Sequence, residues 1–211
     1  METETKLAIQ NRRRAKQVWR SIQLEDLNWI SHPEKLVMKA NYYDTTDHDI
    51  EKNLLAFRLR KEGKAFVATL KGRGREEDGT HIREEVNKTI RLADNVDLLN
   101  PPVNLFKDSE FGKEVADLLK GKVLFIAVVM QFVRMKRRVR YGESTMELSV
   151  DTGKMTTIKG KAPICEMELE LMEGNREDLE ALTKIIAEKY QLEPESRSKI
   201  ARGFALFNSE K

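Results

Sequence analysis

Three glutamates alternate with apolar residues in one short segment of the second half of the chain. Glu166, Glu168 and Glu170 are separated by Met167 and Leu169. Side chains two apart in an extended strand share a face, so this spacing places three carboxylates in a row on one face. Carboxylates this close repel each other unless cations lie between them, and carboxylate oxygens are ligands that Mg²⁺ and Mn²⁺ prefer. The segment therefore predicts a cation or metal site on one face of a strand.

Acidic residues alternate in the same way in two further segments. Glu2 and Glu4 lie near the start of the sequence, with Lys6 next in line. Glu147 and Asp151 lie on one face of another segment, close to the first row of glutamates. Because side chains on one face of a strand repeat every two residues, both segments predict carboxylates gathered on a single strand face.

Basic residues also share faces of predicted strands. Guanidinium groups bind phosphate oxygens through paired hydrogen bonds, and lysines bind them as point charges. Clustered basic residues beside carboxylates that hold a divalent cation are therefore typical of a polyphosphate site. The basic residues concerned are Arg58 and Arg60, Lys71, Arg83 near Glu85, and the row Arg134, Lys136 and Arg138.

The charged strand faces have two interpretations. A single charged face usually points to water, on the outside of a sheet that packs on helices. Because many strands here carry such a face, the sequence favours a sheet closed on itself, with the charged faces inside and helices covering the apolar faces. Such a lumen would hold cations and anions together, as a metal-dependent phosphoryl-transfer site requires.

Hydrophobic periodicity predicts helices and strands in alternating blocks. The predicted helices cover residues 11–30, 111–119, 176–190 and 198–207. The predicted strands cover residues 35–45, 54–61, 64–71, 81–91, 123–140, 145–150 and 164–172. With about eight strands and about four helices, the fold class expected is α+β.

The composition excludes several classes of protein. Of the 211 residues 35% are charged, yet the net charge is only +3, so nucleic acid is not expected as the main partner. Cys165 is the only cysteine, which fits a reducing compartment. The charged first residues do not form a signal peptide, and no apolar run reaches the roughly 20 residues of a membrane span. We expect a cytoplasmic protein with a single domain over residues 1–211 and no membrane partner.

Several short motifs follow one another in a fixed order along nearly the whole chain. They are Glu2-Thr3-Glu4-Thr5-Lys6, Tyr43-Asp44-Thr45, Arg58 and Arg60, Thr69-Leu70-Lys71, Arg83 with Glu85, Lys136, and two closing blocks at 163–171 and 198–204. In these motifs the chain resembles the CYTH superfamily, also called triphosphate tunnel metalloenzymes. The closing blocks are similar to those of its bacterial inorganic triphosphatase branch.

The resemblance implies a closed antiparallel eight-stranded β-barrel that forms a tunnel, with helices packed on the outside. It implies metal-dependent hydrolysis of the terminal phosphate of a linear triphosphate, with inorganic triphosphate as the first expectation. Thiamine triphosphatases and class IV adenylate cyclases share this fold, so both activities stay open, as does a non-catalytic polyphosphate-binding module. A monomer or a homodimer is expected.

The resemblance also assigns roles to the charged residues. The expected catalytic residues are Glu2, Glu4, Lys6, Glu168 and Glu170. The expected ligands of Mg²⁺ or Mn²⁺ are Glu2, Glu4, Asp151, Glu166, Glu168 and Glu170. The expected triphosphate-binding residues are Lys6, Arg58, Arg60, Lys71, Arg83, Arg134, Lys136, Arg138, Lys199 and Arg202. Glu85 is expected to hold a lysine or arginine in place, and removal of Glu168 or Glu170 to abolish turnover with the fold intact.

Overall fold

A computed structural model describes residues 2–62, 65–77, 80–90 and 99–209. The strands are β1 (Glu2–Ala8), β2 (Asn28–Trp29), β3 (Glu34–Thr45), β4 (Ala56–Glu62), β5 (Ala65–Lys71), β6 (Arg75–Glu77), β7 (Thr80–Arg83), β8 (Glu85–Ile90), β9 (Leu124–Tyr141), β10 (Ser144–Thr157), β11 (Gly160–Glu173) and β12 (Glu193–Pro194). The helices are α1 (Arg12–Ile22), α2 (Asp49–Lys52), the 3₁₀ turn η2 (Val103–Phe106), α3 (Glu110–Leu118), α4 (Arg176–Tyr190) and α5 (Lys199–Phe207).

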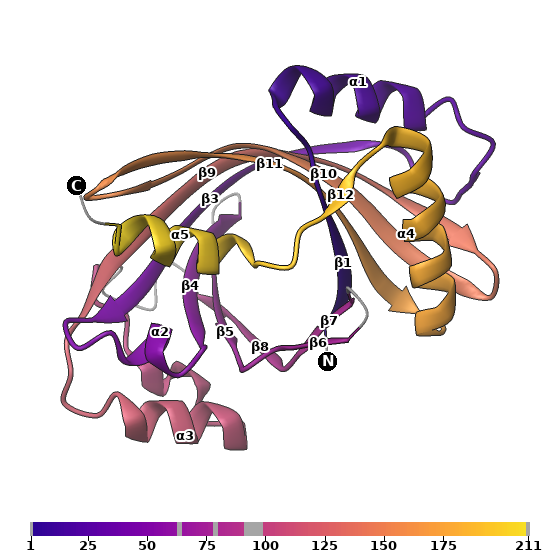
Figure 1. The fold of residues 1–211 in the computed structure, drawn as a ribbon. Helices are drawn as coiled ribbons and strands as arrows, with labels where there is room; N and C mark the ends of the chain where they lie inside the picture. The colour runs from indigo at the N-terminus through magenta and orange to yellow at the C-terminus, as the bar shows by residue number, and fades with distance from the viewer. Residues whose placement is uncertain (1, 63–64, 78–79, 91–98, 210–211) are drawn as a thin grey trace.

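The strands form one antiparallel sheet that curls around a central opening (Figure 1). Its order is β6-β7-β1-β11-β10-β9-β3-β4-β5-β8, with β12 paired to β1 and β2 paired to β9. The fold is therefore α+β, as predicted. The described pairings leave β6 and β8 at the two ends of this order, so they give a curled sheet and not the expected ring closed by eight strands.

The strand predicted over residues 81–91 is split where the sheet ends meet. β7 pairs with β1, whereas β8 pairs with β5, and only Glu84 separates the two. The Glu84 carbonyl accepts the Gly72 N–H at 2.9 Å, outside both ladders. The chain itself thus connects the two ends of the curled sheet.

The convex face of the sheet carries the apolar core that the alternation predicts. Val139, Leu148, Met167 and Leu169 are fully buried there and belong to one cluster with residues of α1 and α4. A second cluster joins the outer faces of β4 and β5 to η2 and α3 and includes the fully buried Phe106. Burial of these apolar side chains supplies most of the driving force for folding.

Helix α5 departs from the expectation that the helices pack outside the barrel. Its residues Ile200 and Phe204 pack with Met130 and Ile164, which lie on the same strand faces as the charged rows. Figure 1 places α5, in yellow, beneath the arch formed by β9, β10 and β11. α5 therefore covers one end of the concave face.

The N-terminal helix is shorter than predicted. α1 ends at Ile22, although the sequence predicts helix over residues 11–30. Leu27 and Trp29 reach the same core cluster from an extended segment, and β2 pairs with β9. Apolar residues two apart satisfy a strand as well as the end of a helix, which explains the error.

None of the helices in the described part of the chain is both long enough and apolar enough to cross a membrane.

Candidate functional site

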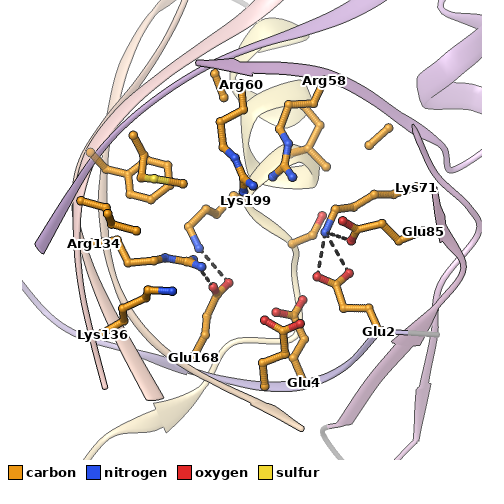
Figure 2. Close-up of a pocket in the computed structure, with 18 of the residues that line it drawn as sticks. Glu2, Glu4, Arg58, Arg60, Lys71, Glu85, Arg134, Lys136, Glu168 and Lys199 are labelled. Carbon is orange, nitrogen blue, oxygen red and sulfur yellow. Dashed lines mark hydrogen bonds and ion pairs between the residues drawn. The ribbon is translucent and has the colours of Figure 1, made fainter. Parts of the chain in front are cut away.

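A cavity of about 620 Å³ lies on the concave face of the sheet, within the range of about 300–1,000 Å³ typical of small-molecule sites. Charged side chains from β1, β4, β5, β9, β11 and α5 point into it (Figure 2). The charged residues that line it include Glu2, Glu4, Lys6, Arg58, Arg60, Lys71, Arg83, Glu85, Arg134, Lys136, Glu147, Glu168, Glu170 and Lys199. The alternation of charge in the sequence therefore produces a mixed acidic and basic wall.

On one side of the cavity Glu2 is held between two cations. Its carboxylate accepts hydrogen bonds from Lys71 Nζ at 2.8 Å and from Arg83 Nε at 2.7 Å. Glu85 adds a second carboxylate to Lys71 at 2.6 Å. Burial alone would raise the pKa of Glu2, but Lys71 and Arg83 hold it well below its usual range. Glu2 is therefore ionised and fixed in place.

On the opposite side Lys199 contacts three buried carboxylates. Its Nζ lies 2.9 Å from Asp151 and 2.7 Å from Glu168, and it also contacts Glu166. Arg134 binds Asp151 through two hydrogen bonds of 2.8 and 2.7 Å and reaches Glu168 at 2.5 Å. α5 delivers Lys199 to this cluster from its first turn, where the Ser198 hydroxyl accepts the Ala201 N–H at 3.1 Å.

The surroundings of these carboxylates shift their titration in opposite directions. Burial opposes the charge on Glu168, but Lys199, Arg134 and Lys6 hold its pKa well below the usual range. Burial and the neighbouring Glu168 raise the pKa of Glu166, although Lys199 opposes that shift. The oxygens of Asp151, Glu166 and Glu168 lie within 4.8 Å of one another, which is close enough for one cation.

Glu170 stands apart because, within the described part of the chain, no hydrogen bond or ion pair joins it to a cation. Strand register places it opposite Glu4 on β1 and opposite Glu147 on β10. Lys6 Nζ lies 2.8 Å from Glu4 Oε1, and Lys136 Nζ lies 2.9 Å from Glu147 Oε2. No side chain among the described residues forms such a pair with Glu170. Burial and the carboxylates of Glu2, Glu4 and Glu147 raise the pKa of Glu170 to about 7.

The carboxylates around Glu170 are of the type that binds divalent cations, although the acidic groups beside the cavity that lie within 4.8 Å of one another, among the described residues, are Asp151, Glu166 and Glu168. Hard ions such as Mg²⁺ and Mn²⁺ take oxygen ligands, and several carboxylates on one wall supply them. A positive ion beside Glu4, Glu147 and Glu170 would relieve the repulsion that raises the pKa of Glu170. The donor set is thus suited to the metal that the sequence predicts.

The raised pKa of Glu170 predicts that the stability of the metal-free protein, measured with EDTA present, depends on pH. The folded protein binds this proton more tightly than the unfolded chain, so the stabilisation is complete below the ordinary pKa of 4.5 and is lost as the pH rises through about 7. Glu170→Gln removes this titration. We therefore expect the Tm of the variant minus that of the wild type to increase between about pH 5 and about pH 8. A constant difference in thermal unfolding with EDTA would contradict the prediction.

The structure brings most of the predicted site residues together, but four of them do not line the cavity. Asp151 and Glu166 lie buried behind Lys199, and Arg202 contacts Glu166 there. Arg138 has a side chain that is 53% exposed, 3.8 Å from Glu147. The other predicted residues line the cavity.

Sequence reasoning missed Tyr42 and Phe132. Tyr42 pairs with Arg58 across β3 and β4, and the Arg58 guanidinium lies 6.0 Å from its ring centre. Burial would raise the pKa of Tyr42, but Arg58 and Lys71 lower it below its ordinary value. Phe132 lies beneath two cations, with Lys199 Nζ 5.6 Å from its ring centre. The alternation of side chains along each strand could have identified both residues, because each shares a strand face with residues that line the cavity.

A second cavity of about 420 Å³ adjoins the first. The two share lining residues, among them Lys71, Arg83 and Ile200. Its other walls combine the apolar residues Leu54, Leu55, Ala201 and Phe204 with the polar residues Glu51, His81, Ser196 and Arg197. The basic cavity is thus continuous with a more apolar one.

Comparison with known proteins gives a family and a curated relative. Residues 1–204 match the model of the CYTH domain. An inorganic triphosphatase of Haemophilus influenzae is 28% identical over 177 residues, which make up 84% of this chain and 48% of that protein. The chain therefore spans about half the length of the curated relative it matches.

Solved structures support the fold. A candidate adenylyl cyclase of Hippeastrum, reported to have a dominant triphosphatase activity, matches with a TM-score of 0.66 at 20% identity, over 97% of this chain and 96% of its own. A candidate adenylate cyclase of Bacillus halodurans matches with a TM-score of 0.61 at 17% identity, over 96% of each chain. At such identities the likeness concerns the fold alone.

Proposed function

Because the chain belongs to the CYTH domain family, we propose that it is a metal-dependent hydrolase of linear triphosphates, with inorganic triphosphate as its preferred substrate. The observation that carries the proposal is one cavity lined both by the cations Arg58, Arg60 and Lys71 and by the carboxylate of Glu170, which pairs with no side chain in the described part of the chain. The name of the Haemophilus influenzae relative supports the choice of substrate.

The basic wall binds the phosphate groups in this proposal. Arg58 and Arg60 share the inner face of β4, and Lys71 lies on the neighbouring β5. Fixed cations at these positions neutralise the charge that spreads over the phosphate oxygens in the transition state, without rearranging during the reaction. Glu2 and Glu85 hold Lys71 by hydrogen bonds and ion pairs, so its ammonium group stays aimed at the lumen.

In this proposal Mg²⁺ or Mn²⁺ would be held by Glu2, Glu4, Glu168 and Glu170, with Glu147 beside them. When bound, the metal supplies charge neutralisation at the phosphate oxygens and a more acidic water. Asp151 and Glu166 orient Lys199, and Lys199 in turn fixes Glu168. We further propose that the curled sheet closes around the substrate as an eight-stranded tunnel.

The apolar second cavity favours one alternative, an organic triphosphate whose non-phosphate part lies beside Leu54, Leu55 and Phe204. The apolar part of these walls would contribute nothing to binding inorganic triphosphate, whereas a nucleoside or thiamine group would bury apolar surface there. The alternatives therefore differ in what occupies the second cavity while the three phosphates occupy the first.

A substrate panel tests the proposal. Purified protein is expected to release phosphate from inorganic triphosphate faster than from ATP or thiamine triphosphate, only with Mg²⁺ or Mn²⁺, and not from pyrophosphate. Arg58→Gln is expected to lower kcat/KM by about 100-fold, and the matched control Arg20→Gln on the exposed face of α1 to leave it unchanged. Preference for an organic triphosphate would change the substrate, and binding without turnover would indicate a polyphosphate-binding module.

A further inference from the structure

A continuous row of hydrogen bonds crosses the lumenal face of β4, β5 and β8. Arg58 Nη2 donates to Thr69 Oγ1 at 3.1 Å, and Thr69 Oγ1 donates to Asn87 Oδ1 at 2.7 Å. Asn87 Nδ2 donates to Glu85 Oε1 at 2.8 Å, and Glu85 pairs with Lys71 at 2.6 Å. The row connects a cation on β4 with a cation on β5 by way of a third strand.

Strand register makes this row a built feature. Arg58 lies directly opposite Thr69, Thr69 lies directly opposite Asn87, and Lys71 lies opposite Glu85. Cross-strand neighbours of this kind are within reach of one another's side chains. The sheet register therefore fixes these three cross-strand pairs, which do not depend on chance contacts between mobile side chains.

Thr69 is the central member, and its hydrogen bonds have a direction. Its side chain is 0% exposed, so no water can replace a lost partner. A hydroxyl has one hydrogen, which Thr69 gives to Asn87, so a lone pair is left for the Arg58 guanidinium. Arg58 Nε is buried without a hydrogen-bond partner in the described residues, so Thr69 and the Tyr42 hydroxyl hold the guanidinium while Nε keeps a free donor.

We propose that Thr69 is a positioning residue that aims Arg58 at the substrate and, through Asn87 and Glu85, couples Arg58 to Lys71. The two phosphate-binding cations then act as one preorganised unit, because neither can swing without breaking the row. This role rests on the proposed function, in which Arg58 and Lys71 bind phosphate oxygens.

The test compares two valine variants that each remove one fully buried hydroxyl. Thr69→Val is expected to raise KM for inorganic triphosphate about 10- to 100-fold, the range for loss of a hydrogen bond to a charged group, with a smaller change in kcat. Thr69→Ser keeps the hydroxyl and is expected to restore KM. Thr80→Val is the control, since Thr80 is also 0% exposed but donates to Glu180 at 3.0 Å, away from the lumen.

A double-mutant cycle separates positioning from general destabilisation. If Thr69 acts through Arg58, then Thr69→Val adds less than about a twofold effect once Arg58→Gln is present. Additive losses, or equal losses in Thr69→Val and Thr80→Val, would overturn the role. If the wild type binds inorganic triphosphate but releases no phosphate, the proposed hydrolysis fails, and the same cycle measured on Kd still decides whether Thr69 positions Arg58.

Discussion

The Glu170→Gln variant is expected to lose metal-dependent phosphate release by about 100-fold or more, because a bound divalent ion supplies several kcal/mol of transition-state stabilisation. Its Tm in chelator is expected to stay the same or to rise. Glu170 has no cationic partner in the described residues and is surrounded by Glu2, Glu4 and Glu147, so removing its charge relieves repulsion. Loss of activity without loss of stability is the signature of a ligand that the fold itself does not need.

The control for this variant is Glu173→Gln, which changes an exposed glutamate on the same strand. It is expected to keep both activity and Tm. Titration calorimetry with Mn²⁺ should give weaker binding to Glu170→Gln than to the wild type. The Kd of Glu173→Gln should be unchanged. Full phosphate release from Glu170→Gln, with unchanged metal affinity, would exclude Glu170 as a metal ligand.

The Lys199→Met variant is expected to lose about 3–5 kcal/mol of unfolding free energy in chelator, the cost of leaving buried charges without their partner. Lys199 Nζ contacts Asp151, Glu166 and Glu168, and the first two are 0% exposed. Because the three carboxylates lie within 4.8 Å of one another, Mn²⁺ is expected to raise the Tm of this variant more than that of the wild type.

Lys189→Met provides the matched comparison. Lys189 pairs with Glu25 on the surface, with a side chain that is 54% exposed, so its loss should change the unfolding free energy by less than about 1 kcal/mol. Chemical denaturation of both variants measures the difference. If Lys199→Met unfolds like Lys189→Met, the three carboxylates do not depend on Lys199 in solution.

The contacts of Glu168 also change one expectation from the sequence. Removal of Glu168 or Glu170 was expected to abolish turnover and leave the fold intact. Glu168 binds both Arg134 and Lys199, so its removal should lower stability as well as activity. Glu170 lacks such partners and keeps the simpler expectation. Alternation assigns both glutamates to one face but does not reveal which cations reach them.

The strands and their faces could be predicted because the information is local. A period of two residues identifies the inward face of β4, β9 and β11 without any knowledge of neighbours, and most of the charged residues on that face line the cavity, with Arg138 and Glu166 as exceptions. The helix over Arg176–Tyr190 could also be predicted, because its apolar residues repeat at helical spacing and Asn175 caps its first turn.

The remaining features depend on contacts between distant parts of the chain. Ile200 and Phe204 form an apolar helical stripe whether α5 packs outside or inside the sheet, and only their contact with Met130 and Ile164 places α5 on the concave face. The split at Glu84 likewise depends on two different partner strands, β1 and β5. Neither is encoded in a window of neighbouring residues.

The position of α5 on the concave face has a consequence for how the protein is made. Glu4 pairs with Glu170, and Lys199 joins the acidic wall from the last helix, so the lumen is assembled from segments at opposite ends of the sequence. During synthesis the acidic row on β1 emerges long before its partner strand and the lysine that neutralises its neighbours. Such long-range pairing makes folding slow, and the nascent chain carries exposed strand edges until α5 arrives. Until α5 and its Lys199 have been synthesised, the chain therefore cannot assemble this charged cavity.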